Sequence, residues 1–221
     1  MSYLIHQTQD PEHLSLEFSG AFWAKAPCVT LDQFRVESSS HRPATQAKLL
    51  YSTQGIYGIF EVQDQYVRCV NTEFQSLVCQ DSCVEVYFKP FKDKGYLNLE
   101  ISGNGTLLSY YITDSTRAPG GFKAFVPLTV EQGRAISIKT TLAPIIEPEI
   151  TEPLTWSLAF FLPFSVLEAY VGSLGTLEGQ VWTGNFFKCA DQTSHPHWAS
   201  WQAVPELNFH MPQTFGELRF A

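Results

Sequence analysis

The stretch SCVEVYFKPFKDKGYLNLEI, residues 82–101, contains two short runs in which apolar and polar residues alternate around a central turn. Alternation with a period of two is typical of a β-strand that has one buried face. The two runs therefore predict a hairpin with one apolar face. That face would hold Val84, Val86, Phe88, Leu97, Leu99 and Ile101.

The opposite face of the predicted hairpin carries Glu85, Tyr87, Asn98 and Glu100. One interpretation is a solvated outer face, as antiparallel sheets often have. The other is a concave sheet face on which carboxylates, an amide and aromatic rings meet a polar ligand. Saccharides suit such a surface, because their hydroxyl groups pair with carboxylate and amide groups and their C–H faces stack on rings.

The rest of the chain shows similar short runs, separated by Gly, Pro, Asn and Asp. One short helix is predicted after Pro163, with Ser165 and Glu168 as a capping box and Gly172 at its end. Residues 144–153 are predicted as an ordered surface loop. Further strands are predicted at 28–36, 47–52, 56–63, 107–113, 121–126, 135–142, 156–162, 181–188 and 216–220.

These elements predict an all-β fold, namely an antiparallel, jelly-roll-like β sandwich with one short helix. At 221 residues the chain is expected to form a single domain, residues 1–221. Apolar residues make up 44% of the chain and charged residues 16%, which favours an ordered core over disorder.

Charge and hydropathy limit the classes of partner. A net charge of −8 without a Lys/Arg cluster argues against binding to nucleic acid. No apolar run is long enough to cross a membrane. The first residues lack a basic region followed by an apolar one, so we expect a cytoplasmic protein, or an extracellular one whose signal peptide has been removed. The five cysteines, an odd number, are expected to be mostly reduced, and the sequence gives no oligomeric state.

Three stretches occur in order along the chain: FWAKAP at 22–27, LLYSTQGIYGIFEVQD with DSCVEVYFKP at 49–64 and 81–90, and NFHMPQTFGELRF at 208–220. Together they resemble family 9 carbohydrate-binding modules and their single-domain relatives. The resemblance implies a β sandwich that binds a saccharide without cleaving it. It also implies that structural calcium is often present.

The resemblance transfers to individual residues only in part. The acidic sugar ligand of the family falls on Glu85, and one clamp aromatic falls on Phe209. The basic ligand falls on Asn98, which is not basic. The second clamp tryptophan has no counterpart in LVCQ, residues 77–80, and a sugar-binding glutamine aligns near Ala159. The fold and the general class therefore transfer better than the binding site does.

The stretch VWTGNFFKCADQTSHPHWASW, residues 181–201, holds three of the five tryptophans and could supply the missing platform. The alternative is that its large aromatics are core residues and fasten a loop to the sandwich, since such side chains are usually buried. His210 borders the presumed ligand surface. The candidate saccharide ligands are Glu85, Asn98, Glu100, Trp182, Asn185, Lys188, Trp198, Trp201, Phe209 and His210.

Two kinds of metal site are considered. Calcium could be held by oxygen ligands such as Asp64 and Asp81, although no dense Asp loop of the EF-hand type is present. Zinc could be held by cysteine and histidine, but no Cys-x2-Cys pair occurs. The zinc candidates are Cys79, Cys83, Cys189, His195 and His197.

The favoured function is non-catalytic saccharide binding. One alternative is a glycoside hydrolase in which Glu85 and Glu100 act as acid and as nucleophile or base, although a sandwich face is shallow for such an enzyme. A second alternative is a protein-interaction sandwich that has lost its sugar site. A nucleophile pair of Cys189 and His210 is a further possibility without a sequence signal for an activated thiol.

Overall fold

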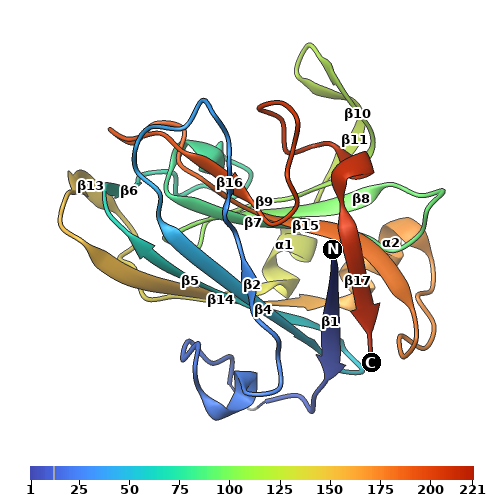
Figure 1. Cartoon of the computed structure of the whole chain (residues 1–221). Helices are drawn as coiled ribbons and strands as arrows, with labels where there is room; N and C mark the ends of the chain where they lie inside the picture. The colour runs from blue at the N-terminus through green and yellow to red at the C-terminus, as the bar shows by residue number, and fades with distance from the viewer. Residues whose placement is uncertain (12) are drawn as a thin grey trace.

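The computed structural model describes residues 1–11 and 13–221 and consists of two β-sheets packed face to face (Figure 1). The all-β prediction is confirmed. The first sheet contains, in spatial order, β11 (Gly121–Pro127), β10 (Tyr110–Ala118), β8 (Tyr96–Ser102), β7 (Cys83–Lys89), β15 (Val181–Cys189), β17 (Gly216–Phe220) and β1 (Ser2–Gln7). The second contains β1, β4 (Ala44–Tyr51), β5 (Gly55–Asp64), β14 (Leu154–Pro163) and β12 (Ser137–Thr140).

The strand β1 joins the two sheets. Its residues 2–5 pair in parallel with β17, and its residues 6–7 pair in parallel with β4. The other long pairings are antiparallel. Six short strands of the described residues extend the sheets or pair separately. Four of them extend the sheets: β2 (Val29–Thr30), β3 (Gln33–Phe34), β9 (Leu107–Leu108) and β16 (Trp198–Ser200). The other two, β6 (Val67–Cys69) and β13 (Ile146–Ile150), pair with each other. Because β13 lies within residues 144–153, the prediction of an ordered surface loop without a strand there is wrong.

The helical elements are short. The predicted helix is α2 (Phe164–Val171), which ends before Gly172 at φ +83°, but its N-cap is Pro163 and the predicted Ser165 capping box is wrong. A second helix, α1 (Val130–Ala135), was not predicted. Short 3-10 turns occur at Ala21–Trp23, Val78–Gln80 and Pro212–Thr214. Within the described residues, neither α-helix has the length and apolar character needed to cross a bilayer.

The main core lies between the sheets. The predicted apolar face of the β7–β8 hairpin points into it, and every member of that face is at most 1% exposed. Strand β15 adds Trp182 and Phe186 on the same side. Burial of each large apolar side chain contributes about 1.5–3 kcal/mol to the free energy of folding, so the interface between the sheets accounts for much of the stability of the fold.

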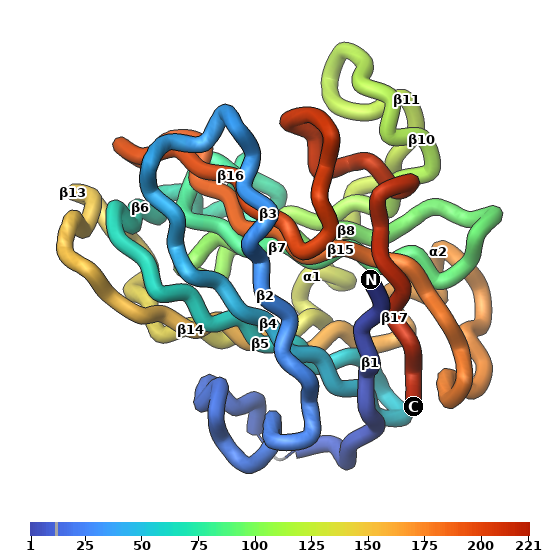
Figure 2. Tube along the Cα trace, in the orientation of Figure 1, coloured from blue at the N-terminus to red at the C-terminus, as the bar shows by residue number. Residues whose placement is uncertain are grey.

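Both sheets are also covered on their outer faces. Residues 14–26 pack Trp23 and Phe18 against the outer face of the second sheet. On the first sheet, the 3-10 turn Val78–Gln80, the β10–β11 hairpin and residues 204–215 contact the outer face. Figure 2 shows the hairpin and the segment before β17 rising on the same side of the first sheet. The polar face of the β7–β8 hairpin is therefore a covered floor and not an open surface.

Candidate functional site

A cavity of about 530 Å³ lies between the outer face of the first sheet and the segments that cover it. We call it the sheet pocket. Its volume is within the range of small-molecule binding sites. Its polar lining consists of Glu85, Glu100, Arg117, Asp191, Asn208 and His210. Its aromatic lining consists of Tyr87, Tyr110, Phe122, Trp198 and Phe209.

The floor of the sheet pocket follows from the register of β7 and β8. Glu85 pairs directly with Glu100 across the strands, and Tyr87 pairs with Asn98. The sequence prediction that these four side chains share one face is therefore confirmed. The interpretation of that face as solvated is wrong, because Glu85 is 2% exposed and Glu100 6%.

A hydrogen-bond network fixes the two glutamates. The Tyr87 hydroxyl donates to Oε2 of Glu85 at 2.5 Å, and the Cys189 thiol donates to its Oε1 at 3.2 Å. The Asn98 amide donates to Oε1 of Glu100 at 2.7 Å. Asn98 is fully buried and is not part of the pocket lining, so its prediction as a direct saccharide ligand is wrong. Burial and then the nearby Glu100 raise the pKa of Glu85 well above its usual value. Glu85 therefore tends to be neutral at the pocket floor.

Glu100 differs from Glu85 in having an oxygen available for a ligand. Among the described residues, the hydrogen bonds and ionic contacts of Glu100 all involve Oε1. Because Glu100 lines the sheet pocket, its Oε2 can accept a hydrogen bond from a hydroxyl group placed there.

His210 forms part of the pocket wall. Its Nδ1 lies 2.9 Å from the Tyr96 hydroxyl, and its Nε2 lies 3.2 Å from the Tyr87 hydroxyl and 3.5 Å from Oε1 of Glu100. Burial lowers the pKa of His210, so the neutral ring is favoured. Both ring nitrogens are occupied by neighbouring side chains, which makes His210 an orienting residue.

Two aromatic rings of the sheet pocket lie where a ligand could stack. Phe209 stacks on Phe187, with ring centroids 4.2 Å apart, and its own ring lines the pocket. Trp198 is partly exposed, and its indole N–H donates to Asp191 at 2.7 Å. Of the three tryptophans in residues 181–201, only Trp198 lines the pocket.

Three other predicted ligands lie away from the sheet pocket and are corrected. Trp182 and Trp201 belong to the core between the sheets, at 1% and 7% exposure. Asn185 is fully buried and exchanges hydrogen bonds with the backbone of Gln202. These side chains hold the sandwich together, as the alternative interpretation of this stretch proposed.

Lys188 is also corrected, because it points between the sheets. Its side chain is 0% exposed, and its Nζ lies 3.6 Å from Oδ2 of Asp64 on the opposite sheet. Nζ also lies 2.8 Å from Nε2 of His197 and donates to the Cys189 carbonyl at 3.0 Å. Lys188 is therefore one member of a buried ionic cluster and cannot reach the sheet pocket.

The two predicted calcium ligands do not fit a calcium site. Burial would raise the pKa of Asp64, but Lys188 and His41 hold it below its usual value. The carboxylate of Asp64 accepts hydrogen bonds from the His41 ring, the Trp156 indole and the Gln65 amide. That of Asp81 accepts from Val70, Asn71 and Ser102. Both carboxylates are thus already occupied by N–H and O–H donors. Within the part of the chain that the structure describes, the two aspartates also have no hydrogen-bond partner in common, so they do not form one site.

The predicted zinc ligands are not brought together as one set. His195 stacks on Tyr66 at a centroid distance of 3.6 Å, and His197 belongs to the Lys188 cluster between the sheets. Cys83 and Cys189 lie instead on the outer face, beside Glu85.

Arg117 is a pocket residue that the sequence analysis missed. It lies near the tip of the β10–β11 hairpin, where its guanidinium group packs over the Phe122 ring at 4.6 Å. The Gly120-Gly121 turn signals a hairpin in the sequence, but nothing local signals that this hairpin folds over β7 and β8. The sequence therefore contains a signal for the hairpin but none for its contact with β7 and β8.

Comparisons with known proteins agree with this architecture. A structure from Bacteroides uniformis, of a protein proposed to bind carbohydrate, is similar with a TM-score of 0.86 and 24% identity, covering 100% of this chain and 99% of the other. A family 9 carbohydrate-binding module from Caldicellulosiruptor kristjanssonii in complex with glucose has a TM-score of 0.67 and 12% identity, covering 100% and 96%. The complex of a module from that organism with cellotriose gives 0.64 and 13%, covering 100% and 93%.

No curated protein sequence matches the chain. The sequence model of carbohydrate-binding family 9, in contrast, matches residues 21–220, nearly the whole sandwich. The match includes the covered outer face, the β7–β8 hairpin and the closing strand β17. This chain therefore belongs to carbohydrate-binding family 9.

Proposed function

We propose that the protein binds a saccharide in the sheet pocket and does not cleave it. Membership of carbohydrate-binding family 9 supports the class of ligand. The similar folds found in complex with glucose and cellotriose support it as well. The observation that carries the proposal is the combination, in one pocket, of the available oxygen of Glu100 with the partly exposed ring of Trp198.

In this proposal the residues have distinct roles. Oε2 of Glu100 accepts a hydrogen bond from a sugar hydroxyl, and Arg117 donates to a ring or hydroxyl oxygen. Trp198 and Phe209 pack against the C–H face of the ring. Few contacts of this kind give an affinity of roughly −4 to −8 kcal/mol, from millimolar to micromolar.

The environment of Glu85 supports binding over hydrolysis. A glycosidase needs two carboxyl groups that both act on one glycosidic bond. Here Tyr87 and Cys189 occupy both oxygens of Glu85, and the side chain is 2% exposed. Glu85 then shapes the pocket floor and leaves direct recognition to Glu100.

Calorimetry with glucose, cellotriose and a panel of other mono- and oligosaccharides tests the proposal. Glu100→Gln is expected to weaken binding at least tenfold, since a hydrogen bond to a charged group contributes roughly 1.5–3 kcal/mol. Trp198→Ala is expected to weaken it by a similar factor. Glu217→Gln, at an exposed acid of β17 outside the pocket, serves as the matched control and should leave affinity unchanged.

Three results would contradict the proposal. The first is the absence of binding to every saccharide tested by the folded protein. The second is binding that neither pocket variant weakens. The third is release of reducing sugar that Glu85→Gln abolishes, which would identify a hydrolase.

A further inference from the structure

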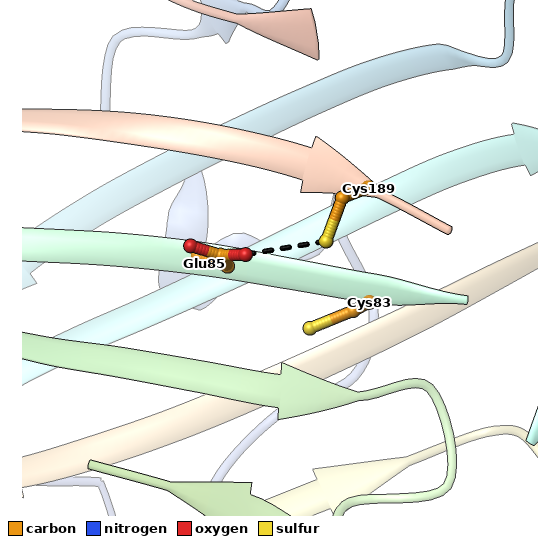
Figure 3. Close-up of side chains that lie close together, drawn as sticks. All are labelled: Cys83, Glu85 and Cys189. Carbon is orange, nitrogen blue, oxygen red and sulfur yellow. Dashed lines mark hydrogen bonds between the residues drawn. The ribbon is translucent and has the colours of Figure 1, made fainter. Parts of the chain in front are cut away.

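Three potential metal-ligating side chains meet at the floor of the sheet pocket (Figure 3). Cys83 and Glu85 are two residues apart on β7, so both point to the outer face. Cys189 is the direct cross-strand partner of Cys83 on β15. One sulfur or oxygen atom of each side chain lies within 4.8 Å of the others, and the Cys189 sulfur lies 3.2 Å from Oε1 of Glu85.

We propose that Cys83, Glu85 and Cys189 form a binding site for a thiophilic divalent cation of the zinc class. Two thiolates with one carboxylate are a donor set that such a cation accepts. Tetrahedral coordination at usual bond lengths places neighbouring ligand atoms roughly 3.6–3.8 Å apart. The observed separation is 3.2 Å between the Cys189 sulfur and Oε1 of Glu85, and no other pair exceeds 4.8 Å, so shifts of about 1 Å bring the three ligand atoms to this geometry.

The surroundings of the three side chains support a cation with one open position. Glu85 and Cys189 line the sheet pocket, so the fourth position faces the pocket, where water or a ligand oxygen can bind. Tyr87 donates to Oε2 of Glu85 and so orients the carboxylate without itself contacting the cation. Glu100 and Asp191 add negative charge nearby.

Binding is a proton-for-metal exchange without electron transfer. The two S–H bonds are replaced by two metal–sulfur bonds, and one metal–oxygen bond forms to Glu85. Two thiol protons leave to solvent, together with any proton carried by Glu85. The hydrogen bond from the Cys189 thiol to Glu85 is thereby replaced by coordinate bonds from both residues to the cation.

Titration of the reduced protein with Cd²⁺ or Co²⁺ tests the site, because thiolate coordination to these ions gives an absorption band. One equivalent per chain is expected to produce the band. Cys83→Ser and Cys189→Ser should abolish it, and Glu85→Gln should weaken metal affinity at least tenfold.

The remaining thiols provide matched controls. Cys69→Ser changes a buried cysteine outside the cluster, and a Cys28→Ser/Cys79→Ser double variant removes the two least buried thiols. Both should keep the band and one equivalent. Thermal unfolding with Zn²⁺ is a second measurement, in which only chains that keep all three ligands should show a raised Tm. It also identifies any variant that has not folded, in which case Glu85→Gln carries the test.

Several results would overturn the inference. They are a folded, reduced wild-type protein that gives no band, a band that survives in folded Cys83→Ser or Cys189→Ser, and a band that requires Cys28 or Cys79. Formation of a Cys83–Cys189 disulfide under mild oxidation, with no metal bound after reduction, would equally show that the cluster is a thiol pair and not a metal site.

Discussion

Replacement of Lys188 by Met separates a structural role for this lysine from the ligand role that its sequence context suggested. Lys188 is 0% exposed and lies between the sheets, with Nζ 3.6 Å from Asp64. Methionine keeps most of the apolar stem and removes the charge. We therefore expect a large loss of stability and no change in the saccharide affinity of the protein that remains folded.

The magnitude follows from the groups left behind. Without Lys188, the carboxylate of Asp64 keeps the His41 ring at 2.8 Å and the Trp156 indole at 3.1 Å. Breaking a buried ion pair costs about 3–5 kcal/mol, because one charge is left uncompensated. Since the ion pair is long and His41 remains, the lower end, about 3 kcal/mol, is expected. For a chain of this length that corresponds to a decrease in Tm of roughly 6–12 °C.

Urea unfolding at pH 7, followed by tryptophan fluorescence, measures the change. Lys139→Met, at an exposed lysine of β12, is the matched control and should change the free energy of unfolding by at most about 0.5 kcal/mol. Adding Asp64→Asn to Lys188→Met removes the stranded charge, so the double variant should be more stable than the sum of the two single changes predicts. The reasoning is refuted if Lys188→Met changes stability by less than about 1 kcal/mol, or if the folded variant loses saccharide affinity.

Two further predictions concern stability. Burial, and then the charge of Lys188, lower the pKa of His197 to about 3. Between about pH 3 and about pH 6.5, the usual pKa of histidine, the unfolded chain therefore binds a proton at this residue that the folded chain does not bind. The free energy of unfolding should thus fall as pH decreases below 6.5, by at most about 1.4 kcal/mol per pH unit from this group, and unfolding curves that coincide at pH 7 and pH 5 would contradict the assignment. Gly184→Ala would place a Cβ 2.3 Å from the Tyr87 carbonyl oxygen and 2.7 Å from the Leu218 side chain. It should cost about 1–3 kcal/mol, and an unchanged Tm would show that the strands can separate without strain.

The alternation of residues along β7 and β8 was sufficient to predict the two faces of the hairpin. It could not predict that the polar face is covered, because the covering segments come from residues 77–80, 117–122 and 204–215. Contacts between segments so far apart in sequence leave no periodic signal in either partner. The same reason applies to β1, a short strand whose two partners, β4 and β17, are far apart in the sequence.

Some errors of the sequence analysis had a signal available. Lys188 is two residues from Phe186 and six from Trp182, so the alternation that buries both aromatics places Lys188 on the same inner face. A lysine on such a face indicates a buried acidic partner, and Asp64 at the end of β5 is that partner. Thr129 and Gln132 form a capping box that would have predicted α1. The identity of the partner, in contrast, depends on how the sheets pack and could not be predicted.

The two glutamates at the pocket floor show why a position aligned with a family ligand does not by itself identify the group that contacts the ligand. Glu85 occupies the aligned position, but Tyr87 and Cys189 take both of its oxygens, and burial favours its neutral form. Glu100, its cross-strand partner, keeps Oε2 available at the pocket surface. Direct hydrogen bonding to a hydroxyl group is therefore expected one strand away from the aligned position. Glu85, although it is not expected to contact the saccharide, can then serve in the cation site that we propose with the adjacent thiols of Cys83 and Cys189.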